Sequence, residues 1–138
     1  GLATMAYALP AAIAAAIKET DRTVVAFTGD GGLLMCLGEL STAVEQDIPI
    51  VVIVFNDQSL SLIDIKQQAS GLPSRGMRWE TPNFSQVMEG LGGKSYQVNN
   101  IQQYRQALDE ALEIGSPVLI DVLFNPEGYG QQLKALRG

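Results

Sequence analysis

Two short apolar runs separated by a helical pattern constrain the fold of this chain most strongly. The first run covers residues 23–27 (Thr-Val-Val-Ala-Phe), and the second covers residues 50–55 (Ile-Val-Val-Ile-Val-Phe). Runs this short and this apolar are typical of strands that are buried on both faces of a parallel sheet. The pattern between them predicts a strand–helix–strand unit, whose crossover should be right-handed.

An acidic residue follows each run. Asp30 lies in the turn Thr28–Gly32 (Thr-Gly-Asp-Gly-Gly), and Asp57 follows Asn56 at the end of the second run. Parallel strands end at the same edge of a sheet, and open α/β sheets bind ligands at the carboxyl edge. Two carboxylates there, one of them in a glycine turn, suggest a divalent cation that holds a phosphate.

The remaining patterns predict a single doubly wound α/β domain, with a mainly parallel sheet and helices on both faces. The region 69–82 contains two prolines and two glycines, so we expect an irregular loop that is long enough to serve as a lid. We expect Pro10 to start or kink the first helix and Asn83 to cap a later one. The predicted helices are 5–19, 37–46, 59–68, 83–91 and 101–112, and the further strands are 94–98 and 117–123.

Composition removes several classes of function. The net charge of −6 argues against a basic nucleic-acid-binding surface, and the absence of His excludes Ser-His-Asp and Cys-His catalysis. The single cysteine, Cys36, rules out an internal disulfide and fits a reducing, cytoplasmic compartment. No apolar run reaches the roughly 18 residues of a membrane span. The chain also begins in the middle of a pattern and without an initiator Met, which suggests that residues 1–138 are part of a longer chain.

Each acidic motif taken alone has a purely structural explanation. Gly29-Asp30-Gly31-Gly32 is equally typical of a strand-exit turn and of a loop whose Gly31 and Gly32 N–H groups face a phosphate. Asn56-Asp57 is also a common pair in turns. The motifs become informative only in combination.

The combined motifs resemble a known family. Gly29-Asp30-Gly31 is followed some two dozen residues later by Asn56-Asp57. This arrangement is similar to the pyrophosphate-binding domain of thiamine-diphosphate enzymes, and more narrowly to the acetolactate synthase, benzoylformate decarboxylase and pyruvate oxidase superfamily. Those proteins carry Gly-Asp-Gly and then Asn-Asn. Residues 1–12, 39–44 and 49–52 also resemble the family, so that the similarity covers nearly the whole chain.

The resemblance implies a thiamine-diphosphate and Mg²⁺ site. In it, Asp30 and Asp57 bind the metal through their side chains, and Ser59 binds it through its backbone carbonyl. Met5 wedges between the rings of the cofactor, although its spacing alone favours a core residue of a helix. Ala3 accepts a hydrogen bond from the aminopyrimidine through its carbonyl. The full set of implied cofactor-binding residues is Ala3, Met5, Gly29, Asp30, Gly31, Gly32, Asp57, Ser59, Leu60, Ser61 and Leu62.

The chain departs from the family at several positions. Asp57 replaces the usual second Asn, which adds negative charge beside a diphosphate. Leu60-Ser61 replaces the aromatic–glycine pair of many decarboxylases, and the aromatic residue expected near Lys66 in acetolactate synthases is absent. The resemblance implies that residues 60–66 border the substrate, whereas their spacing also fits an ordinary amphipathic helix. Three loop residues either meet a substrate carboxylate or are simply solvated: Arg75, Arg78 and Trp79.

The resulting hypothesis is the cofactor-binding domain of a 2-oxo-acid decarboxylase or carboligase. The resemblance places the activating glutamate in a separate pyrimidine-binding domain, usually across a dimer interface. We therefore expect no catalytic residue in this chain, no activity without that partner, and a homo-oligomeric parent protein. A non-catalytic diphosphate- or nucleotide-binding module is the alternative. A Rossmann-like dinucleotide domain is disfavoured, because no Gly-x-Gly-x-x-Gly follows the first strand. The 2-oxo acid, its acceptor and any FAD remain open.

Overall fold

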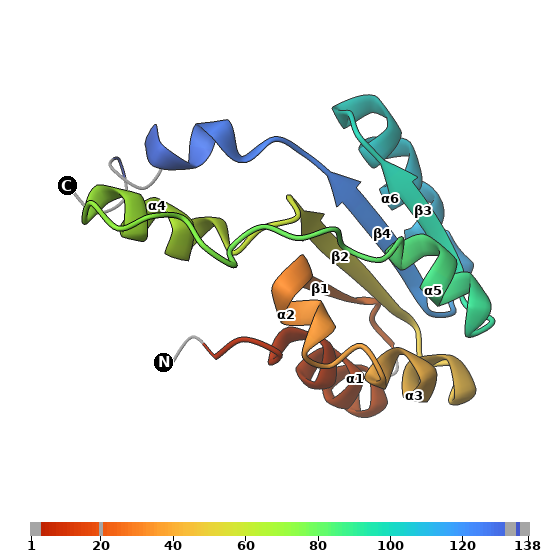
Figure 1. Ribbon diagram of the computed structural model, residues 1–138. Helices are drawn as coiled ribbons and strands as arrows, with labels where there is room; N and C mark the ends of the chain where they lie inside the picture. The colour runs from red at the N-terminus through yellow and green to blue at the C-terminus, as the bar shows by residue number, and fades with distance from the viewer. Residues whose placement is uncertain (1–3, 20, 132–134, 136–138) are drawn as a thin grey trace.

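A four-stranded parallel sheet organises the chain, in the strand order β1-β2-β4-β3 (Figure 1). The computed structural model describes residues 4–19, 21–131 and 135. The strands are β1 (Val24–Gly29), β2 (Ile50–Asn56), β3 (Lys94–Val98) and β4 (Val118–Leu123). The helices are α1 (Ala8–Lys18), α2 (Asp30–Leu34), α3 (Glu39–Glu45), α4 (Ser61–Ala69), α5 (Phe84–Gly90) and α6 (Ile101–Ile114), followed by the 3-10 turn η1 (Pro126–Gly128).

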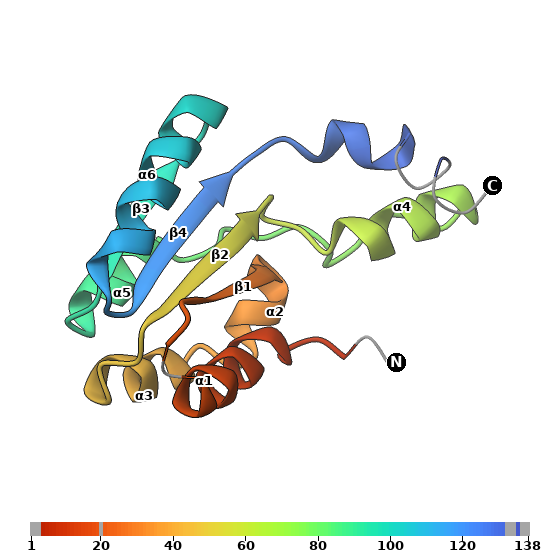
Figure 2. The same ribbon diagram turned by 180° about the vertical axis from the view of Figure 1, so that it is seen from behind.

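Helices cover both faces of the sheet, as the sequence predicts. On one face, Leu9 and Ile13 of α1, Leu40 of α3 and Phe84 of α5 pack against alternate residues of the strands. On the other face, α6 packs on β3 and β4 through small residues such as Ala107. Figure 2 shows the α6 side of the molecule from behind. The predicted doubly wound α/β fold is therefore confirmed.

The expectation that both apolar runs are buried on both faces holds for residues 50–54 of β2 but is wrong for Phe55 and for β1. Val25 and Phe27 of β1 are 36% and 56% exposed, and Phe55 of β2 is 41% exposed. The reason is the strand order: β1 lies at the edge of the sheet, and the core cluster beneath α6 contains residues of β2, β3 and β4 but none of β1. The rings of Phe27 and Phe55 stack on each other with centroids 6.1 Å apart.

The first helix begins later than its sequence pattern suggests. Residues 5–19 were expected to be helical, but α1 starts at Ala8 and carries Pro10 in its first turn, where proline is tolerated. Ala6 has a φ of 64°, in the left-handed region that interrupts a helix. Met5 therefore lies outside α1. Asn83 does cap α5, because its side-chain oxygen accepts a hydrogen bond from the Gln86 N–H at 3.0 Å.

The segment from Asp57 to residue 82 extends beyond the carboxyl ends of the strands. In Figures 1 and 2, α4 projects away from the sheet, and the chain that follows it returns alongside. The return is fixed by a bridge between Ser59 and Arg78 and by a 2.8 Å hydrogen bond from the Leu60 N–H to the Met77 carbonyl. Residues 70–82 contain no helix or strand, as predicted. None of the helices in the described ranges is long and apolar enough to cross a bilayer.

Candidate functional site

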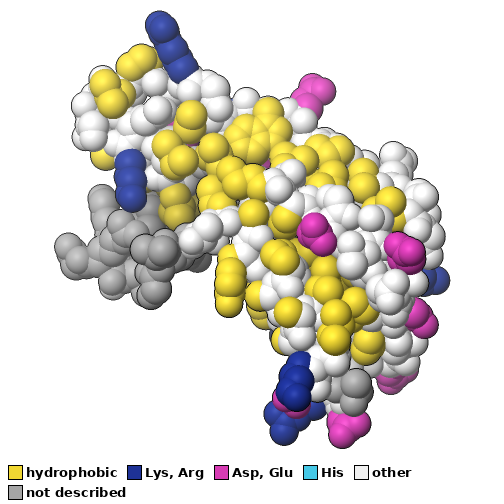
Figure 3. Space-filling view, turned by 90° about the horizontal axis from the view of Figure 1, so that it is seen from below, with side chains coloured by type: hydrophobic (Ala, Val, Ile, Leu, Met, Phe, Trp, Pro, Cys, Tyr) yellow, Lys and Arg dark blue, Asp and Glu magenta, His cyan; other side chains and the backbone are white. Residues whose placement is uncertain are grey.

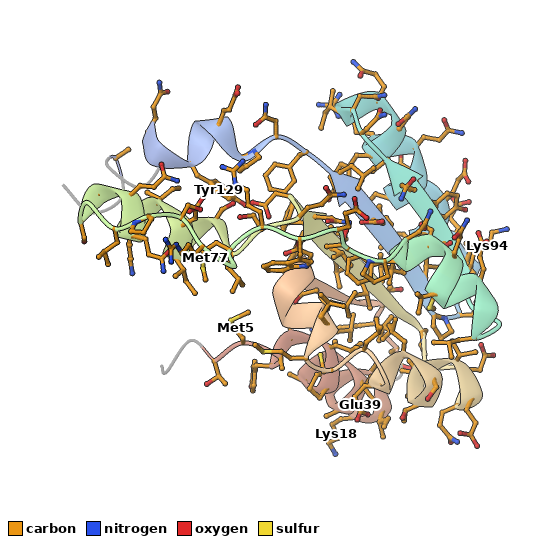
Figure 4. The ribbon with its side chains drawn as sticks, in the orientation of Figure 1. Met5, Lys18, Glu39, Met77, Lys94 and Tyr129 are labelled. Atoms are coloured by element: carbon orange, nitrogen blue, oxygen red, sulfur yellow. The ribbon has the colours of Figure 1, made fainter. Side chains whose placement is uncertain are left out.

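A cavity of about 460 Å³ opens at the carboxyl edge of β1 and β2. Its walls come from the segment before α1, from the start of α2, from the turn after β2 and from the first residues of α4 (Figure 4). The parallel register brings these elements together, because Gly29 at the end of β1 lies opposite Phe55 near the end of β2. The cavity is lined by Thr4, Met5, Ala6, Tyr7, Ala8, Phe27, Thr28, Gly29, Asp30, Gly31, Gly32, Phe55, Asp57, Ser59, Leu60, Ser61, Leu62, Ile63 and Tyr129.

Asp30 is the first residue of α2 and is only 3% exposed. Its Oδ1 accepts a hydrogen bond from the Gly31 N–H at 2.7 Å, whereas its Oδ2 is buried without a hydrogen-bond partner among the described residues. Burial raises the pKa of the Asp30 carboxyl, and the nearby negative charge of Asp57 raises this pKa further. A buried carboxylate with an unpaired oxygen beside a second carboxylate is suited to a bound cation.

Asp57 forms a tight turn after β2. Its Oδ1 accepts from the Ser59 N–H at 3.2 Å, and its Oδ2 accepts from the Ser61 hydroxyl at 2.6 Å. Gln58 has a φ of 58°, which reverses the chain direction within the turn. Asp57 and Ser59 line the same cavity as Asp30, so this turn lies beside Asp30. The two acidic motifs thus meet at one edge of the sheet.

Gly31 lies in a short helix and is closely surrounded by side chains. Asp30–Leu34 form the short helix α2 rather than a turn, and the Gly31 N–H is bonded to Asp30 instead of facing outward. The side chains around Gly31 also approach its backbone closely. A Cβ on Gly31 would lie 2.9 Å from Leu60 Cδ2, 3.4 Å from Met5 Cε and 3.7 Å from Trp79 Cη2.

Met5 lines the cavity and is 41% exposed, so the interpretation of Met5 as a buried core residue of a helix is wrong. In Figure 4 its side chain rises from the segment before α1 toward the space beneath α4. Leu60, Ser61 and Leu62 line the same cavity from the start of α4. Ala3, the other residue implied in this segment, lies outside the described residues.

The loop cations do not reach the cavity. The Arg78 guanidinium lies 3.5 Å from the buried Asp64 carboxylate of α4 and remains 74% exposed. Arg78 is therefore an anchor between the loop and α4, and neither Arg75 nor Lys66 is part of the cavity wall. Trp79 lies behind Gly31, with its indole N–H buried and without a hydrogen-bond partner in the described part of the chain.

Sequence reasoning missed Tyr129, which lines the cavity from the segment after β4. Burial raises the pKa of the Tyr129 hydroxyl, and the charges of Asp57 and Asp30, which line the same cavity, raise this pKa further. Its ring contacts Phe124 edge-on, with centroids 5.7 Å apart. The position of Tyr129 beyond the carboxyl end of a parallel strand is the signal that would have identified it.

The charges of the cavity define what can bind there. Two carboxylates line it, and none of its lining residues in the described ranges is Lys or Arg. An anionic ligand at this position would be repelled unless a cation lay between it and the carboxylates. Carboxylate oxygens are preferred ligands of Mg²⁺, and Mg²⁺ commonly bridges one or two carboxylates to phosphate oxygens. The residues present therefore fit a metal-bound diphosphate whose organic part contacts the apolar walls.

Comparison with known proteins gives a consistent result. Residues 1–122 match the family described as "Thiamine pyrophosphate enzyme, C-terminal TPP binding domain". The chain is 35% identical over 126 residues to the putative thiamine pyrophosphate-containing protein YdaP of Bacillus subtilis (strain 168), covering 91% of this chain and 22% of that protein. It is 36% identical over 131 residues to the acetolactate synthase isozyme 1 large subunit of Escherichia coli (strain K12), covering 92% and 23%.

A solved structure shares the fold. The thiamine diphosphate-dependent 4-hydroxybenzoylformate decarboxylase of Rhodococcus jostii RHA1 superposes with a TM-score of 0.82 at 26% sequence identity. The superposition covers 88% of this chain and 23% of that one. This chain thus spans less than a quarter of the length of each of these relatives.

Proposed function

Because the chain belongs to the thiamine pyrophosphate enzyme family through its C-terminal TPP-binding domain, we propose that it holds thiamine diphosphate through Mg²⁺ for a 2-oxo-acid decarboxylase or carboligase of the acetolactate synthase type. One observation supports the presence of a metal ion. The cavity is lined by the carboxylates of Asp30 and Asp57 and, among its described lining residues, by no cationic side chain. A diphosphate would need Mg²⁺ as its counter-charge there. Calorimetric titration of the complete protein should show thiamine-diphosphate binding that requires Mg²⁺ and is lost with a chelator. Equal thiamine-diphosphate affinity in the presence of the chelator would contradict the proposed role of Mg²⁺.

Each part of the cavity has a task in this proposal. The side chains of Asp30 and Asp57 and the backbone carbonyl of Ser59 would hold the metal, and the start of α2 would lie beside the diphosphate. Met5 and Leu60 would pack against the rings and fix their relative orientation. When bound, thiamine diphosphate supplies the carbon nucleophile and the electron sink for decarboxylation of a 2-oxo acid. The apolar walls would keep water away from that carbon.

The proposal also includes a partner, a pyrimidine-binding domain that carries the activating glutamate. The supporting observation is an apolar face beside the cavity. Figure 3 shows hydrophobic side chains running as a band across the molecule, with Lys and Arg at its periphery. Met5, Leu62 and Ile63, which line the cavity, are 41%, 48% and 44% exposed. Exposed apolar areas of this kind are typical of protein–protein contacts, and the relatives are long enough to contain further domains.

We predict that residues 1–138 alone do not turn over 2-oxo acids. Without the partner there is no glutamate to activate the cofactor, and one wall of the site is missing. The purified chain, supplied with Mg²⁺, thiamine diphosphate and a panel of 2-oxo acids, should release no CO₂ above the background reaction. Turnover of about 1 s⁻¹ or more, an ordinary enzymatic rate, would show that this chain contains a complete site. The complete protein assayed in parallel is the positive control.

We predict that Met5→Ala in the complete protein lowers turnover more than it lowers cofactor affinity. Met5 lies on the wall that faces the rings, whereas the diphosphate is held at Asp30 and Asp57, so the substitution should loosen the ring geometry and leave the anchor intact. Steady-state kinetics and calorimetry of the same variant separate the two effects. Leu72→Ala, which removes a 57% exposed side chain that is not part of the cavity wall, is the matched control. Equal losses of turnover and cofactor affinity would contradict the role of Met5 in orienting the cofactor rings.

A further inference from the structure

A buried hydrogen-bond network lies beside the cavity and has no part in the function proposed above. Its centre is Asp121 of β4, which is 0% exposed. Asp121 Oδ1 accepts from the Asn56 side-chain amide at 2.9 Å, and Asp121 Oδ2 accepts from the Gln97 side-chain amide at 3.1 Å. The Asn56 oxygen in turn accepts from the Thr81 hydroxyl at 3.1 Å. The network thus joins β3, β4 and β2 to the loop that follows α4.

The direction of these hydrogen bonds leaves Asn56 a single orientation. An ionised carboxylate only accepts hydrogen bonds, so Asn56 must present its NH₂ group to Asp121 and its oxygen to Thr81. Turning the amide over would bring two oxygens together at the 2.9 Å contact. Asn56 is itself 3% exposed and is the last residue of β2, directly before Asp57. Asp121 therefore fixes the side chain from which the Asp57 turn begins.

Burying the Asp121 carboxylate in a strand costs free energy of desolvation. Both donors that the structure gives it among the described residues are neutral amides, and a buried carboxylate without a cation carries a desolvation penalty. An apolar side chain would fill the same space without that penalty, but it would leave the buried amide of Asn56 unpaired. The carboxylate thus serves the end of β2 rather than the hydrophobic core.

We propose that Asp121 is a positioning residue for the metal end of the site: by holding Asn56, it sets where Asp57 and its turn stand against Asp30. The inference rests on the proposed function, because it assigns Asp57 to the metal. Residues that orient metal ligands from behind typically affect metal affinity about 10- to 100-fold. Asp121 does not line the cavity, and its side-chain hydrogen bonds go to Asn56 and Gln97, neither of which lines the cavity. It would therefore act on the metal site only through Asn56.

The test compares Asp121→Leu with Gln97→Leu in the complete protein. Asp121→Leu removes the hydrogen bonds to both Asn56 and Gln97, whereas Gln97→Leu removes only the bond between Gln97 and Asp121 and leaves Asn56 held. Titration calorimetry with Mg²⁺ at saturating thiamine diphosphate should show affinity about 10- to 100-fold weaker for Asp121→Leu and unchanged affinity for Gln97→Leu. Thermal unfolding of both variants separates this effect from general destabilisation. Equal Mg²⁺ affinity in the two variants would overturn the proposal.

Exchanging the side chains of Asn56 and Asp121 provides a second test. It remains decisive even in the case that the Asp121→Leu variant does not fold. Asn56→Asp alone sets two carboxylates against each other and should weaken Mg²⁺ binding. Adding Asp121→Asn restores the contact, because the new amide at position 121 donates to the new carboxylate at position 56 and still accepts from Gln97. Recovered Mg²⁺ affinity in the double variant supports the proposal, and no recovery overturns it. Absent Mg²⁺-dependent binding in the unmodified protein would instead overturn the proposed function, and this inference with it.

Discussion

Asp30→Ala is expected to abolish the Mg²⁺-dependent binding of thiamine diphosphate. Asp30 is buried at the carboxyl edge of the sheet, and its Oδ2 has no hydrogen-bond partner among the described residues, so it is free to coordinate a cation. Without this ligand, the diphosphate loses its counter-charge in a cavity that has no cationic lining residue among those described. Calorimetry of the complete protein should detect no binding at cofactor concentrations that saturate the unmodified protein. Unchanged affinity would refute the metal assignment.

Asp57→Asn is the matched control for this experiment. It also removes a carboxylate from the cavity, but an amide oxygen remains to coordinate Mg²⁺, and the resemblance implies that Asn is the usual residue at this position. We therefore expect the variant to bind the cofactor in Mg²⁺. If Asp57→Asn abolished binding as completely as Asp30→Ala, the second motif would have been assigned in the wrong register.

The raised pKa of Asp30 predicts that the stability of the metal-free protein depends on pH. A carboxyl whose pKa is higher in the folded than in the unfolded protein binds more protons when folded, so it destabilises the metal-free fold as pH rises through the interval between the two values. Asp30→Asn should therefore raise the thermal midpoint of the metal-free protein at neutral pH. This gain should disappear at acidic pH, where the carboxyl is protonated in both states. Unfolding curves without Mg²⁺ across this pH range measure the effect.

Gly31→Val is expected to produce the second large loss, of both stability and cofactor affinity. Even a single Cβ at this position would lie 2.9 Å from Leu60 Cδ2 and 3.4 Å from Met5 Cε, and a valine adds two further methyl groups. Overpacking of this kind typically costs about 1–3 kcal/mol, and here it displaces side chains that form the cavity wall. Denaturant unfolding and thiamine-diphosphate titration of the complete protein measure the two losses.

Gly38→Val is the control, because a Cβ on Gly38 would meet no atom within 4 Å. Gly38 is exposed just before α3, so the same chemical change there should leave cofactor affinity unaltered. If Gly31→Val bound the cofactor as tightly as Gly38→Val, the close packing around Gly31 would not be needed for the site. The comparison therefore tests whether the glycine serves packing.

Local patterns in the sequence were sufficient to predict the α/β fold. Strand β2 is a continuous apolar run, the caps and breakers mark the helix ends, and the parallel connection alone requires that Asp30 and Asp57 meet at one edge. Each of these signals depends on residues that are close together in the sequence, so it can be recognised without the structure. The family resemblance depended in the same way on two motifs and the distance between them.

Only the tertiary structure decided which surfaces those elements share. Phe27 is exposed because β1 became an edge strand, Met5 faces the cavity because Ala6 interrupts the helical pattern, and the Arg78 guanidinium lies 3.5 Å from the Asp64 carboxylate and outside the cavity wall. Tyr129 lines the cavity from a segment far along the chain, and Asp121 is bonded to Asn56 across 65 residues of sequence. The physical reason is common to all of these cases: burial, electrostatic environment and hydrogen-bond partners are set by residues that are distant in sequence, and no local pattern encodes which of them will become neighbours.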